Sequence, residues 1–140
     1  MTFLLDTNVI SEMRRPERAA LPVLTWVSAQ AEETLWCSVI SILELEMGAL
    51  QALRRDKLKG TMLRSWIDER VLPRFQDRIV AIDTVVALKC AALHVPDPKP
   101  DRDAYIAATA LVHNLTVITR NTRDFASTGV KLFNPWEVAT

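Results

Sequence analysis

The chain has 140 residues, in which 17 lysines and arginines balance 17 aspartates and glutamates. Its length is typical of one domain, and its apolar share of 49% and charged share of 24% exclude a disordered chain, a fibre and a coiled coil. A net charge of zero also excludes nucleic-acid binding through overall basic charge. Any such contact must depend on a local patch or on a metal ion.

Several other protein classes are excluded as well. Cys37 and Cys90 lie in apolar runs without zinc-site spacing and are typical of reduced core thiols in the cytoplasm. Three glycines are too few for the glycine-rich loops that bind ATP, GTP or NAD. The first residues lack the basic segment of a signal peptide, and no apolar run approaches the roughly 20 residues that span a bilayer. We therefore expect a cytoplasmic protein without membrane contact.

Hydrophobic patterning predicts strands that alternate with helices. In chain order we expect a strand at 3–5, helices at 9–14 and 21–30, a strand at 35–37, helices at 39–55 and 58–72, a strand at 79–82, helices at 84–93 and 103–113, a strand at 116–119 and an edge strand at 130–133. Ser38 is the expected N-cap of the third helix, Pro73 the expected end of the fourth, and the proline-rich residues 95–101 a surface loop. This order predicts an α/β fold with a parallel sheet and helices on both faces.

Acidic residues fall near the expected carboxyl ends of the strands, where such folds place their sites. Asp6 follows the first strand, Glu44 lies in the helix after the second, Asp103 opens the helix before the fourth, and Asp124 lies beyond the fourth, with Asn121 between. Carboxylates that converge repel one another unless a cation is present, and Mg²⁺ prefers such oxygen ligands. Metal-assisted cleavage of phosphodiester bonds is the chemistry that this arrangement favours.

Each acid also has a purely structural interpretation that the sequence leaves open. The alternatives are a helix cap at Asp6, a capping box from Ser41 to Glu44, an N-cap at Asp103 or Asp101, and a solvated loop position at Asp124.

Basic residues near the same edge have two interpretations. Arg120 and Arg123 follow the fourth strand and are candidates for contacts with an RNA phosphate backbone, although a solvated charged surface is the alternative.

Four segments of the chain resemble the motifs of PIN-domain proteins, in the family's order and over nearly the whole length. They are Leu4-Leu5-Asp6-Thr7-Asn8-Val9-Ile10-Ser11-Glu12, Ser38 to Gly48 with Glu44 at the acidic position, Asp103 to Ala110, and Val117 to Phe125; Asn134-Pro135-Trp136 resembles the usual ending. The closest resemblance is to bacterial toxins of the VapC and FitB type.

This resemblance implies a single PIN domain over residues 1–140, a three-layer α/β/α fold with a mainly parallel sheet of four to five strands. It further implies an endoribonuclease toxin that depends on Mg²⁺, with Mn²⁺ as a substitute, and that a cognate antitoxin neutralises. Family members usually form homodimers, and higher oligomers with the antitoxin.

By position, the resemblance assigns Asp6, Asp103 and Glu44 to the metal and the catalytic cluster. Either Asp124 or Asn121 is the fourth site residue, and the sequence does not decide between them. The remaining implied roles are supporting ones, at Thr7, Asn8 and Thr119. Two alternatives remain: a PIN-fold binding module without needed catalysis, and a metal-dependent nuclease that is not a toxin.

Overall fold

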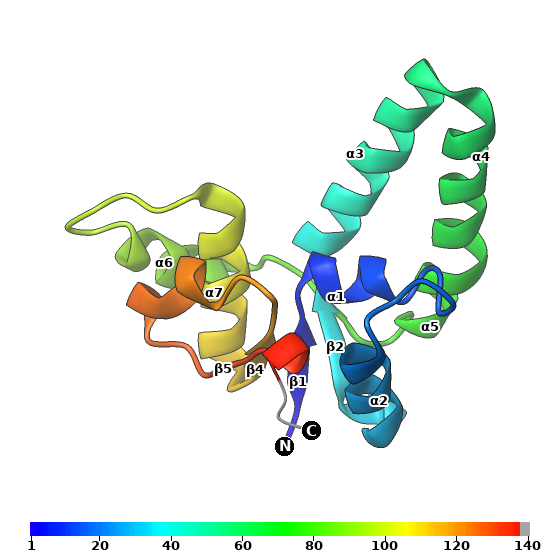
Figure 1. The fold of residues 1–140 in the computed structure, drawn as a ribbon. Helices are drawn as coiled ribbons and strands as arrows, with labels where there is room; N and C mark the ends of the chain where they lie inside the picture. Colours follow the sequence, from blue (N-terminus) through cyan, green and yellow to red (C-terminus); the bar gives the residue numbers. More distant parts are fainter. Residues whose placement is uncertain (138–140) are drawn as a thin grey trace.

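A five-stranded parallel sheet forms the centre of the computed structural model, which describes residues 1–137 (Figure 1). The strand order is β3-β2-β1-β4-β5, and each neighbouring pair is parallel. The strands are β1 (Phe3–Leu5), β2 (Leu35–Ser38), β3 (Ile79–Val80), β4 (Thr116–Ile118) and β5 (Leu132–Phe133). The predicted strands are confirmed, with β3 and β5 shorter than their apolar runs.

Helices cover both faces of this sheet, which gives the expected three layers (Figure 1). They are α1 (Thr7–Glu12), α2 (Leu21–Ala29), α3 (Val39–Arg55), α4 (Lys57–Trp66), α5 (Leu72–Arg74), α6 (Thr84–Leu93), α7 (Asp101–His113) and α8 (Thr122–Phe125). The hairpin of α3 and α4 extends away from the sheet, and α6 packs beside α7 on the opposite side. None of the helices described in residues 1–137 is long and apolar enough to cross a bilayer.

Side chains of β1 show how the layers are joined. Phe3 and Leu5 face the core formed with α1, α2 and α3, whereas Leu4 faces the core formed with α7. Successive side chains of a strand point to opposite faces, so a strand that is buried on both sides needs a continuous apolar run. Cys37 and Cys90 are free and buried, as expected.

The prediction that Pro73 ends one long helix is wrong. Regular α-helix ends earlier, at Trp66, and a π turn (Ile67–Val71) leads into α5, which contains Pro73. The Leu72 N–H donates to Ile67 O, five residues back, and this wider turn accommodates the proline, which has no N–H to donate.

Two further differences concern the neighbourhood of the acids. Helix α7 begins at Asp101 instead of Asp103, because Pro100 has an extended backbone and serves as the N-cap. The predicted cap role of Asp101 or Asp103 is therefore wrong, and both lie in the first turn of the helix. Residues 122–125 form the short helix α8, which four residues are too few to reveal by periodicity.

Candidate functional site

The strand order reverses at the carboxyl edge of the sheet, and the place beyond the ends of β1 and β4, where the predicted acids lie, is called the acidic crevice here. From β1 the chain proceeds to β2 and β3 on one side, and β4 then lies on the other side of β1. Ligands of parallel α/β folds bind at such a switch point, beyond the carboxyl ends of the strands. Asp6 and Thr119 directly follow β1 and β4 and so face this crevice.

The carboxylate of Asp6 is held on both oxygens. Oδ1 accepts a hydrogen bond from the Thr7 N–H (2.8 Å), and Oδ2 accepts one from Thr119 Oγ1 (2.7 Å) and one from Asn8 Nδ2 (3.4 Å). Asp6 is the N-cap of α1 and is only 6% exposed. Asp6 therefore caps α1 and at the same time lies at the candidate site.

Glu44 reaches the same crevice from α3. Ser38 caps this helix by accepting from the Ile40 N–H, so the proposed capping box between Ser41 and Glu44 is wrong. Glu44 instead accepts a hydrogen bond from Thr7 Oγ1 (2.7 Å), which also lies 2.9 Å from Ser41 Oγ. Thr7 thus links the start of α1 to the first turns of α3.

Asp103 and Asp124 bring further negative charge to the crevice. The pKa of Asp103 is raised to about 6, mainly by burial and then by the carboxylates of Asp6, Asp124 and Glu44. Burial also raises the pKa of Asp6, against the hydrogen bonds from Thr119 and Thr7. The negative charges of the other acids therefore act on Asp6 and Asp103, although Asp124 is exposed on α8.

The donor chemistry of the crevice fits a hard divalent cation. A cation would relieve the repulsion that raises the pKa of Asp103, and Mg²⁺ typically uses one or two carboxylates together with water and substrate phosphate. Within residues 1–137, no three histidine, cysteine or acidic side chains stand close enough to enclose a metal ion. At most two of the acids would therefore hold one ion, which is compatible with Mg²⁺ because this ion takes water and substrate phosphate as its other ligands.

A chain of hydrogen bonds supports the acids from the β4 side. Thr119 Oγ1, which donates to Asp6, accepts from the Asn121 N–H (3.0 Å). Asn8 Oδ1 accepts from the Arg120 N–H (3.4 Å), and Asn134 Nδ2 donates to Arg120 O (3.4 Å). The residues predicted to support the site thus meet at the ends of β1 and β4.

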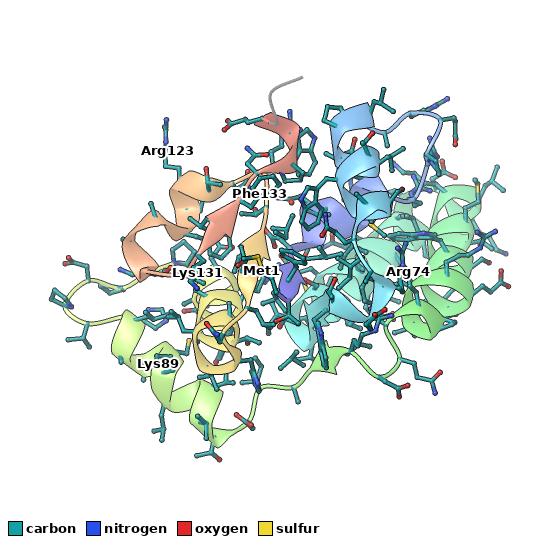
Figure 2. The ribbon with its side chains drawn as sticks, turned by 90° about the horizontal axis from the view of Figure 1, so that it is seen from below. Met1, Arg74, Lys89, Arg123, Lys131 and Phe133 are labelled. Atoms are coloured by element: carbon teal, nitrogen blue, oxygen red, sulfur yellow. The ribbon has the colours of Figure 1, made fainter. Side chains whose placement is uncertain are left out.

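The two arginines predicted to contact RNA have different surroundings. The guanidinium of Arg120 lies 5.4 Å from the centre of the Trp136 ring, which fixes its direction. Arg123 projects from α8 away from the body of the protein (Figure 2). In the described part of the chain, neither is ion-paired to an acid of the crevice.

Sequence reasoning missed two residues of the site. Arg102 Nη1 lies 3.6 Å from Glu44 Oε2, and Ser41 is a buried neighbour of Thr7. The position of Arg102 directly before Asp103 was the available signal for the first. The second depends on how α1 lies against α3, which no local pattern reveals.

Comparisons with known proteins show the family of this chain. The model of the PIN domain matches residues 3–131. The plasmid stability protein StbB of Pseudomonas syringae is 40% identical and aligns with 96% of this chain and 98% of its own length. The toxin FitB of Neisseria gonorrhoeae is 38% identical over 95% of this chain and 97% of its own.

A VapC ribonuclease of Sinorhizobium fredii is also 38% identical, over 97% of this chain and 99% of its own. Among solved structures, FitAB bound to a DNA fragment superposes with a TM-score of 0.88 at 34% identity, over 99% of both chains. Both the sequence and the fold therefore place the chain in the PIN-domain family, on the branch that contains the FitB toxin and VapC ribonucleases.

Proposed function

We propose that this protein is the toxin of a toxin–antitoxin system and that it acts as a Mg²⁺-dependent endoribonuclease. The observation that carries the proposal is the group of carboxylates beyond β1 and β4. The pKa values of Asp6 and Asp103 are raised there by burial and by the neighbouring acids, and a bound cation would relieve both effects. Relatives that match nearly the full length carry the names toxin and ribonuclease, which supports the same function.

In this mechanism the chain's own residues hold the acids in fixed directions. Thr119, Asn8 and the Thr7 N–H orient the carboxylate of Asp6, and Thr7 Oγ1 orients that of Glu44. When bound, Mg²⁺ supplies the positive charge that activates water and stabilises the charge developing on the phosphate. The substrate strand would pass the carboxyl end of β4, near Arg120, Asn121 and Asp124.

The partners belong to the same proposal. Structures similar to this chain include FitAB and a toxin–antitoxin complex of Klebsiella pneumoniae, which supports a cognate antitoxin as the inhibitor. The proposal also includes RNA as the substrate, a homodimer that forms higher oligomers with the antitoxin, and a cytoplasmic location. Mn²⁺ is the expected substitute for Mg²⁺ because it accepts the same oxygen ligands.

The test is the substitution Asp6→Asn, with Asp97→Asn in the exposed proline-rich loop as a matched control. We expect Asp6→Asn to abolish both growth arrest and Mg²⁺-dependent RNA cleavage while its circular dichroism remains that of the parent. Asp97→Asn should behave like the parent, and EDTA should abolish RNA cleavage by both of these proteins. Undiminished cleavage by Asp6→Asn would overturn the nuclease assignment, and growth arrest without cleavage would favour a binding module.

A further inference from the structure

A small cavity lies beside the acidic crevice, between α1, α3, α4 and the π turn. Its volume is about 180 Å³, below the usual range for drug-sized ligands, so it suits one part of a longer ligand that extends beyond it. Thr7 and Glu44 of the acidic crevice also line this cavity, so the cavity lies directly beside the acids. A substrate strand bound at the acids would therefore pass directly over it.

The walls of this cavity have two chemical characters. One side is apolar and is formed by α3, α4 and the π turn, with Leu45, Leu63, Trp66 and Ile67. The polar lining residues are Thr7 and Ser11 of α1, Arg14 beyond α1, and Glu44 of α3. Apolar side chains together with a cation are a combination that can hold a nucleotide, whose base packs on the apolar surface while its phosphate is neutralised.

Arg14 lacks the partner that a partly buried guanidinium normally has. Burial, followed by the nearby charge of Arg15, lowers the pKa of Arg14, and the negative charge of Glu17 opposes them only in part. Within residues 1–137 no carboxylate lies at ion-pair distance from Arg14, whereas Arg64, Arg74 and Arg78 all have one. Partly desolvated cations are stabilised by an anion, and the cavity that Arg14 lines leaves room for one.

Gly48 gives an independent indication that the cavity must stay open. It lies inside α3, one turn after Glu44, and lines the cavity. Glycine destabilises a helix interior by about 1 kcal/mol relative to alanine. A Cβ added at Gly48 would meet no atom within 4 Å, so the fold itself does not require glycine there. Gly60 differs, because an added Cβ there would clash with the backbone of Leu53.

We propose that this cavity is a nucleotide subsite for the RNA strand, in which Arg14 binds a phosphate next to the scissile one. A base lies on the apolar wall at Leu63 and Trp66, and the absence of a side chain at Gly48 leaves room for it. The proposal rests on the ribonuclease function proposed above and names how that substrate is held.

Two measurements test the subsite separately from catalysis. The first is the binding of a short fluorescein-labelled single-stranded RNA of random sequence, followed by anisotropy in EDTA over a series of salt concentrations. The variants are Arg14→Gln and Gly48→Leu, and their matched controls are Arg18→Gln in the same loop and Gln51→Leu on the same helix. Both control positions are exposed and lie outside this cavity.

We expect Arg14→Gln to weaken RNA binding about tenfold and to reduce the slope of log affinity against log salt by about 0.7, the value of one lost phosphate contact. Gly48→Leu should weaken binding by a similar factor without changing the slope, because it blocks the base and removes no charge. The controls should bind like the parent.

The second measurement is steady-state RNA cleavage with Mg²⁺, where both variants should raise KM and leave kcat nearly unchanged. Parental KM and parental affinity in both variants would overturn the subsite. The same result together with a weaker complex with the co-expressed antitoxin would assign the cavity to the antitoxin instead. If the parent itself does not cleave RNA, the proposed function fails, whereas the binding series still decides on the subsite.

Discussion

The carboxyl group of Asp103 allows a test of the acidic crevice that does not require RNA or metal. In the folded protein its pKa is raised from 3.8 to about 6, by burial first and by three neighbouring carboxylates next. The folded state thus binds the proton more tightly than the unfolded state. The contribution of the protonated Asp103 to the free energy of unfolding is fully present below pH 3.8 and is lost as the pH rises through 6.

The expected size of this loss follows from the same pKa values. One pKa unit corresponds to about 1.4 kcal/mol, so the full difference sets an upper limit of about 3 kcal/mol above pH 6. Asp103 is partly exposed, and solvent screening reduces this limit. The ionised group also gains roughly 0.5 kcal/mol from the first turn of α7. We therefore expect Asp103→Asn to stabilise the metal-free protein by about 1 kcal/mol at pH 7.5.

Urea unfolding in EDTA, followed by circular dichroism at pH 7.5 and pH 4, measures this difference. The stabilisation by Asp103→Asn should be present at pH 7.5 and absent at pH 4, where the parent carboxyl is protonated. Asp101→Asn is the control, because Asp101 lies in the same helical turn and its side chain is 86% exposed. It should leave stability unchanged or slightly lower. An Asp103→Asn protein that is less stable than the parent at pH 7.5 would refute the argument that the acids repel one another.

Two further predictions concern metal binding and packing. Mg²⁺ at ten times its dissociation constant should stabilise the parent by about 1.4 kcal/mol in thermal unfolding, and it should stabilise Asp103→Asn clearly less. Equal stabilisation of the two proteins by Mg²⁺ would argue against Asp103 as a ligand. Gly60→Ala should destabilise the protein by about 2 kcal/mol in urea, because the new Cβ would lie 2.5 Å from the Leu53 backbone and α3 and α4 must separate. An unchanged midpoint in urea would show that the hairpin yields without cost.

Much of this architecture could be predicted because its signals are local. The buried runs that form β1, β2 and β4 end in polar residues, and the acid after such a run must lie at the carboxyl edge of a parallel sheet. The start of α3 was also predictable, since Ser38 both ends β2 and caps the helix. Asp6 and Glu44 were found for these reasons.

The remaining features depend on how elements lie against one another. Thr7 and Ser41 are 34 positions apart, and their contact exists only because α1 lies against α3. The π turn before Pro73 could not be predicted, because a single π turn leaves no periodic signal in the sequence. Arg102 was missed since a long cation on an exposed helix face is usually solvated.

The sequence offers two interpretations of Asp6, as a helix cap and as a candidate site residue. The structure shows that one position can fill both roles. A cap needs an acceptor at the N-terminus of a helix, and a parallel α/β fold places that terminus at the carboxyl edge of the sheet, where sites form. The cap bond to the Thr7 N–H uses Oδ1 and leaves Oδ2 with Thr119 and Asn8. The bonds that stabilise α1 therefore also fix the direction of the carboxylate. Because Asp6 is buried near other acids, these same bonds keep its pKa from rising further, which favours the ionised carboxylate that the proposed Mg²⁺ would bind.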